Sequence, residues 1–173
     1  PRVVRVGTHA LTATSRTILW NRLSAHRGHI GGKNAGGGNH RGSIFRLHAG
    51  AALMARDPAA GWPSTWGVGS SAPAATRATE QALERAVSAH LGSMELLWLS
   101  VPSPEKRGFV ERHVIALLSN AGKTPIDLPS ASWLGRTAQR EAIRDSGLWN
   151  VNHVYDPLEP AFLEVFARLV NAA

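Results

Sequence analysis

The stretch Val3-Val4-Arg5-Val6-Gly7-Thr8-His9 decides the expected fold, because valine alternates with arginine in it before the glycine. Alternation with a period of two is typical of a strand with one buried face. The segment from Ser15 to His26 follows, and its apolar residues Ile18, Leu19 and Leu23 recur at the spacing of a helix. We therefore expect a strand that leads through a polar turn into an amphipathic helix.

Two later stretches extend this pattern. The run from Met94 to Val101 is the most apolar short segment and predicts a central strand. Ser103-Pro104 predicts a helix start, because serine caps helices and proline suits the first helical position, and the helix is expected to reach about Asn120. Further helices are expected near 45–55, 76–90 (with Leu83 and Val87 buried), 137–146 and 161–170. The sequence thus predicts an α+β domain with a small antiparallel sheet flanked by about five helices.

Charge is the clearest compositional signal. The 173 residues carry 19 Lys and Arg against 12 Asp and Glu, a net charge of +7, and include eight histidines. Such a surface attracts polyanions, and nucleic acid is a common partner of Arg-rich domains. A GC-rich genome would also favour Arg over Lys, so composition leaves both explanations open. The length predicts one domain, 1–173.

Cysteine and membrane signals are absent from the sequence. With no cysteine, disulfides, thiolate metal sites and cysteine nucleophiles are excluded. No apolar run reaches the length of a membrane span, so we expect a protein of the cytoplasm.

Four polar residues form the candidate site. Arg22 and His26 lie one turn apart on the expected first helix, Glu111 interrupts an apolar helix, and Asn120 ends that helix. Each has an ordinary alternative: Arg22 as a solvated residue, His26 as a cation at a helix end, Glu111 paired with Arg107 or Arg22, and Asn120 as a helix terminus.

This ordered set resembles the GIY-YIG nucleases over roughly residues 3 to 120. Arg5-Val6-Gly7 stands where the family has its second tripeptide, Arg22-x-x-x-His26 follows on the next helix, and Glu111 lies within Phe109–Ile115. The segment 38–47 is similar to a region that places a further histidine near the site in some members. The chain departs from the family at Arg5, which replaces a tyrosine, and the first tripeptide would belong to a strand before Pro1.

The resemblance implies a metal-dependent endonuclease acting on nucleic acid, DNA being the expected substrate. Glu111 would bind Mg²⁺ or Mn²⁺, Arg22 would bind the nonbridging phosphate oxygens, and His26 would accept a proton or orient the water. Asn120 would hold the carboxylate or a phosphate, with Asn150 and Asn152 as competitors for that role. The resemblance also implies a nuclease core at 1–120, an extension at 121–173 that packs on it, and a possible homodimer as the partner state.

Other basic residues would guide the nucleic acid. The expected phosphate contacts are Arg16, Arg27, Lys33, His40, Arg41 and Arg46. The alternative for these residues is a generic basic surface. Two further interpretations are a zinc site formed by histidines 9, 26, 29 and 40, and base stacking by Trp62 and Trp66; the alternatives are ordinary core or loop roles. For the whole chain, the alternatives are an inactive nucleic-acid-binding module that keeps the fold, or a subunit that docks through its C-terminal helix.

Overall fold

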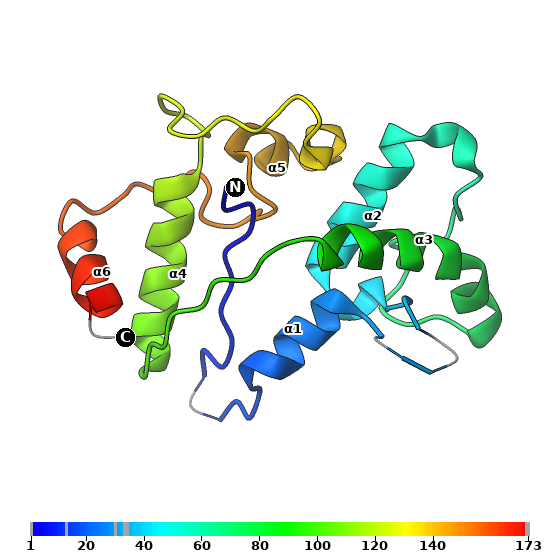
Figure 1. Ribbon diagram of the computed structural model, residues 1–173, viewed down its shortest axis with the longest axis horizontal. Helices are drawn as coiled ribbons and strands as arrows, with labels where there is room; N and C mark the ends of the chain where they lie inside the picture. The colour runs from blue at the N-terminus through cyan, green and yellow to red at the C-terminus, as the bar shows by residue number, and fades with distance from the viewer. Residues whose placement is uncertain (1, 13, 30, 33–34, 172–173) are drawn as a thin grey trace. The chain divides into compact units, whose positions relative to one another are not determined.

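The computed structural model describes residues 2–12, 14–29, 31–32 and 35–171 (Figure 1). The chain forms two compact units. Unit 1 comprises Pro1–Leu19, Leu96–Ala131 and Glu141–Ala173, and unit 2 comprises Trp20–Glu95 and Ser132–Arg140. The predicted division into a core at 1–120 and an extension at 121–173 stays a prediction.

The described ranges contain helices and no strand, so the prediction of an α+β fold with a sheet was wrong, and this part of the chain is all-α. There are six α-helices in these ranges, where about five were expected. They are α1 (Leu19–Arg27), α2 (Ile44–Arg56), α3 (Ala74–Gly92), α4 (Pro104–Leu118), α5 (Glu141–Ser146) and α6 (Phe162–Asn171). Three short 3-10 helices accompany them: η1 (His40–Gly42), η2 (Pro58–Ala60) and η3 (Leu134–Thr137).

The N-terminal segment is extended but forms no ladder, because side chains supply part of its pairing. The N–H of Trp149 donates to the carbonyl of Val4 at 2.7 Å. At the residue after Trp149, the side-chain carboxamide of Asn150 takes the place of a backbone hydrogen-bond partner. Its Oδ1 accepts from the N–H of Val6 at 3.0 Å, and its Nδ2 donates to the carbonyl of Val6 at 2.9 Å. A side chain that satisfies both backbone groups of Val6 stops a regular strand pair from continuing.

The second expected strand, 94–101, is an irregular connection between α3 and α4. Leu97 and Trp98 are 84% and 75% exposed. An apolar run predicts a buried strand only when neighbouring strands cover it, and the described residues include none.

Unit 1 is built on α4, against which α6 packs (Figure 1). Ser103 accepts a hydrogen bond from the N–H of Lys106 at 3.3 Å, which confirms the predicted cap, and Pro104 occupies the first turn. Phe109 on α4 lies 5.8 Å from Phe162 on α6, ring centroid to ring centroid. Ile115, Leu148 and Val154 form a buried cluster in the same unit.

Unit 2 is built on α2 and α3, which contact each other, and η3 packs on α2. Leu83 and Val87 are fully buried, as predicted from their spacing on α3. The expected apolar stripe of α1 is not buried: no residue of α1 falls in the buried class, and Ile18 just before it is 57% exposed.

Candidate functional site

Two predicted site residues lie one turn apart on α1. Arg22 and His26 are both half-buried. The Nδ1 of His26 lies 2.7 Å from the Oγ of Ser43, and the carbonyl of His26 accepts a hydrogen bond from Nη1 of Arg46 at 2.8 Å. The histidine is therefore anchored at its ring and at its backbone, both times by residues at the start of α2.

Glu111 lies on α4 in unit 1 and is half-buried. Its Oε1 accepts a hydrogen bond from the N–H of Thr8 at 3.2 Å. The alternative of an ion pair with Arg107 finds no support, since that guanidinium donates to the carbonyls of His9, Ala10, Val101 and Pro102. The segment that carries the predicted tripeptide thus lies directly against Glu111.

Asn120 follows α4 and organises the loop after it. Its Nδ2 donates to the carbonyl of Asp127 at 2.9 Å, and its Oδ1 accepts from the N–H of Ile126 at 3.1 Å. Asn150 holds Val6, as described above, and Asn152 is exposed. The catalytic role predicted for Asn120 stays a prediction.

The four candidate residues are divided between the two units. Arg22 and His26 share α1, whose residues from Trp20 onward belong to unit 2, while Glu111 and Asn120 belong to unit 1.

A buried ion-pair network in unit 2 was not predicted from the sequence. Glu84 on α3 accepts three hydrogen bonds from two buried side chains: Nδ1 of His40 at 2.9 Å, and Nε and Nη2 of Arg46 at 2.9 and 2.5 Å. Burial by itself would raise the pKa of Glu84, but the hydrogen bonds from His40 and the charge of Arg46 outweigh it and hold the pKa below its ordinary value. The carboxylate is therefore ionised and fully engaged.

Glu80, one turn earlier on α3, forms the second part of this network. Its two oxygens accept from Nη1 and Nη2 of Arg41 at 2.6 and 2.8 Å, and Thr65 Oγ1 adds a third hydrogen bond at 2.8 Å. These bonds, led by those from Arg41, lower the pKa of Glu80. A signal existed in the sequence: Glu80 and Glu84 occupy the same helix face as the buried Leu83 and Val87.

The predicted phosphate contacts differ in exposure. Arg16 and Arg27 are exposed, whereas His40 and Arg46 are 2% and 0% exposed and the Arg41 side chain is 4% exposed. Lys33 lies outside the described residues. The buried three are engaged with Glu80 and Glu84, so Arg16 and Arg27 are the exposed members among the five that the structure describes.

Trp66 occupies a core position rather than an open surface. Its ring stacks on His40 at 3.8 Å, and its Nε1 donates to the carbonyl of Leu47 at 3.0 Å. The Nε2 of His40 accepts from the N–H of Gly67 at 3.1 Å while Nδ1 faces Glu84. Both ring nitrogens of His40 are therefore engaged in hydrogen bonds.

Glu111 fits a divalent metal that keeps most of its water ligands. In the described ranges, no three His, Cys, Asp or Glu side chains gather as a metal cluster. Mg²⁺ does not require one, because it binds through one or two carboxylates, waters and substrate phosphate. Glu111 is half-buried, and in the described part of the chain it forms no ion pair that would neutralise it.

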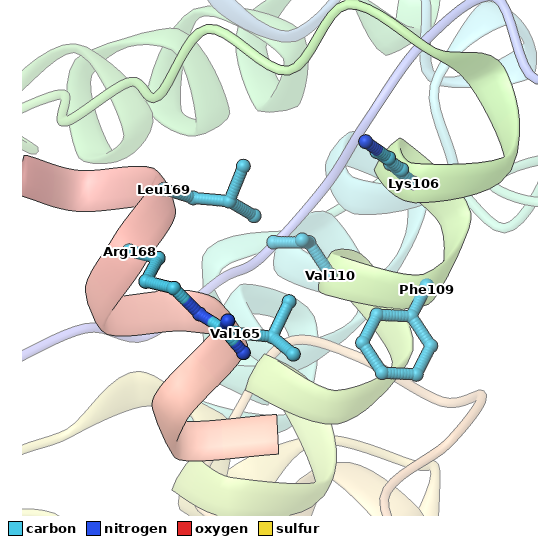
Figure 2. Close-up of a pocket in the computed structure, with 6 residues that line it drawn as sticks. All are labelled: Lys106, Phe109, Val110, Val165, Arg168 and Leu169. Carbon is cyan, nitrogen blue, oxygen red and sulfur yellow. The ribbon is translucent and has the colours of Figure 1, made fainter. Parts of the chain in front are cut away.

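A shallow pocket of about 200 Å³ lies between α4 and α6 (Figure 2). Phe109, Val110, Val165 and Leu169 line its apolar part, and the basic side chains of Lys106 and Arg168 also border it. None of these residues belongs to the predicted site.

A comparison with protein families finds that the GIY-YIG domain matches residues 1–173. The chain belongs to the GIY-YIG family. Members of this family are generally endonucleases, which indicates a nuclease-type function and a nucleic acid substrate for this GIY-YIG domain. No curated protein and no solved structure matches the chain significantly.

Among the helices that the structure describes, none combines the length and hydrophobicity of a membrane-spanning segment. The predicted cytoplasmic location and the predicted homodimer both stay predictions.

Proposed function

We propose that this GIY-YIG domain is a metal-dependent endonuclease that hydrolyses phosphodiester bonds in DNA, with Arg22, His26 and Glu111 as its catalytic residues. The observation that carries the proposal is the state of Glu111: a half-buried carboxylate that accepts one backbone hydrogen bond, from Thr8, and enters no ion pair in the described residues. Such a carboxylate has a second oxygen, Oε2, with which it could bind a cation.

Glu111 would hold Mg²⁺ or Mn²⁺. When bound, this ion would polarise the phosphoryl oxygen and stabilise the leaving oxygen. The N–H of Thr8 fixes Oε1 and so restricts the rotation of the carboxylate on α4. Preorganisation of this kind lowers the cost of ordering the ligand during the reaction.

Arg22 would bind the nonbridging phosphate oxygens with two parallel N–H groups, and their charge grows in the transition state. Its half-buried position on α1 suits this role, because partial burial strengthens a charge-assisted hydrogen bond. His26, one turn further, would contact the phosphate or the attacking water. Arg16 and Arg27 would bind flanking phosphates as exposed cations.

The direct test is nicking of supercoiled plasmid DNA with Mg²⁺ or Mn²⁺ and with EDTA. We expect nicked product with the metal and none with EDTA. A single-stranded RNA of mixed sequence, assayed in parallel, separates the proposed DNA substrate from RNA. Equal product with and without metal would contradict the proposal.

A second candidate function is an inactive nucleic-acid-binding module, and Arg5 favours it. This residue stands at the tyrosine position of the second tripeptide, and its Nη1 donates to the carbonyl of Trp149 at 2.8 Å. The Arg5 side chain therefore links the N-terminal segment to the segment at Trp149, and it lacks the hydroxyl group that a tyrosine would supply. This function predicts salt-sensitive DNA binding that persists in EDTA, together with a blank nicking assay.

A further inference from the structure

We infer that Ser43 sets the tautomer of His26, so that His26 acts through an Nε2–H group as a hydrogen-bond donor to a phosphate oxygen and not as a base. This inference rests on the proposed function for the identity of the phosphate. The state of the ring itself follows from contacts within unit 2 and can be measured separately.

Ser43 is the capping residue of α2, and its hydroxyl has two contacts. Its Oγ accepts a hydrogen bond from the N–H of Arg46 at 3.3 Å, and the same Oγ lies 2.7 Å from Nδ1 of His26. Ser43 is 3% exposed. Of these two contacts, only Nδ1 of His26 can receive the hydroxyl hydrogen, because the other partner is a donor.

The burial of Ser43 decides between the two directions of this hydrogen bond. If Nδ1 carried a hydrogen, it would donate to Oγ, and the serine hydrogen would be left buried without an acceptor. A buried polar hydrogen without an acceptor is unfavourable. Ser43 therefore donates to Nδ1, and the single hydrogen of the neutral imidazole resides on Nε2.

The ring is also fixed in position from α2. Phe45 meets the imidazole of His26 edge to face, with centroids 5.7 Å apart and planes at 74°. Arg46 donates Nη1 to the His26 carbonyl, and Glu84 holds Arg46 in turn. Ser43 and Phe45 thus contact the ring of His26, and Arg46 contacts its backbone carbonyl.

The tautomer determines the chemistry available to His26. A general base needs a lone pair at the nitrogen that faces the nucleophile, whereas an Nε2–H group offers a hydrogen and no lone pair there. Phosphate oxygens carry no hydrogen and only accept, so they match this donor. His26 would stabilise their negative charge without transferring a proton, and Ser43 is its positioning residue.

Three variants of Ser43 separate this role from helix capping. Ser43→Thr keeps both the cap and the hydroxyl donor. Ser43→Asp keeps the cap, but its carboxylate only accepts, so it draws the ring hydrogen to Nδ1. Ser43→Ala removes both functions and serves as the measure of lost stability.

The first measurement is the position of the ring hydrogen of His26, read from the nitrogen chemical shifts of the labelled protein near pH 8, well above the ordinary histidine pKa of about 6.5. We expect the hydrogen on Nε2 in the unchanged chain and in Ser43→Thr, and a hydrogen on Nδ1 in Ser43→Asp. A hydrogen on Nδ1 in the unchanged chain would overturn the inference. This readout does not depend on any cleavage by the protein.

The second measurement is single-turnover cleavage of DNA with Mg²⁺. Loss of one preorganised donor costs about 100-fold or more in rate, so we expect such a fall for Ser43→Asp and little change for Ser43→Thr. Equal rates for Ser43→Asp and the unchanged chain would overturn the donor role. A blank assay for the unchanged chain would contradict both the proposed function and the phosphate role, while the shift measurement would still decide the tautomer.

Discussion

Arg46 and Glu84 form a fully buried ion pair in which Nε and Nη2 of the guanidinium converge on Oε2 of the carboxylate, at 2.9 and 2.5 Å. The Nη2 group also donates to Ser88 Oγ at 3.0 Å, and Nη1 donates to the carbonyl of His26. The pair therefore links α2, α3 and the end of α1 within unit 2.

Glu84→Gln should destabilise unit 2 strongly. Breaking a buried pair leaves Arg46 with an uncompensated charge, which costs about 3–5 kcal/mol in the free energy of unfolding. Arg85→Ala is the matched control, because Arg85 is the exposed neighbour on α3 and should change the free energy by about 0.5 kcal/mol or less. Chemical denaturation monitored by tryptophan fluorescence measures both, and equal effects would contradict a buried pair.

Acid should destabilise the protein through Glu80 and Glu84. Both have a folded pKa below the ordinary value of about 4.3, so the unfolded chain binds more protons between the two values. Their contribution to stability is therefore present above about pH 5 and is lost as the pH falls through the folded pKa. We expect the thermal midpoint to fall below that pH, and the fall to be smaller in the double variant Glu80→Gln, Glu84→Gln. An identical slope in both proteins would exclude these carboxylates as the source.

Gly50→Ala should destabilise α2 in spite of the higher helix propensity of alanine. A Cβ at this position would collide with Cζ2 of Trp66, whose Nε1 is held by a hydrogen bond to the carbonyl of Leu47. Overpacking of this kind costs about 1–3 kcal/mol. Gly92→Ala is the control, since a Cβ there meets nothing within 4 Å. Thermal melts of the two variants check this, and a melt of Gly50→Ala at or above that of Gly92→Ala would contradict the packing.

The sequence predicted the helices that carry their own signals. Ser103-Pro104 marked the start of α4, and the spacing of Leu83 and Val87 marked the buried face of α3. The prediction of a sheet was wrong. The alternation in residues 3–7 and the apolar run in residues 94–101 are properties of single segments, and they do not show whether a partner strand exists. Asn150 pairs with Val6 through its side chain, and no local pattern predicts this.

The candidate site was inferred from local signals of the same kind, and the structure does not test it. Arg22, His26 and Glu111 were chosen from spacing along helices and from the resemblance, whose family the comparison confirms, although their roles stay predictions. The contact between His26 and Ser43 spans 17 residues, and the pairing of Glu84 with Arg46 spans 38. Contacts between separate helices of this kind have no periodic signature in one sequence.

Glu111 offers the most direct test of the account. The measurement is the single-turnover rate of plasmid nicking with Mg²⁺ for the unchanged chain, Glu111→Gln and the control Glu105→Gln, an exposed carboxylate in the first turn of the same helix. Metal stabilisation of about 3 kcal/mol corresponds to a rate loss of about 100-fold in Glu111→Gln, with DNA binding in EDTA retained and Glu105→Gln unaffected. Nicking by Glu111→Gln at the rate of the unchanged chain would contradict the account.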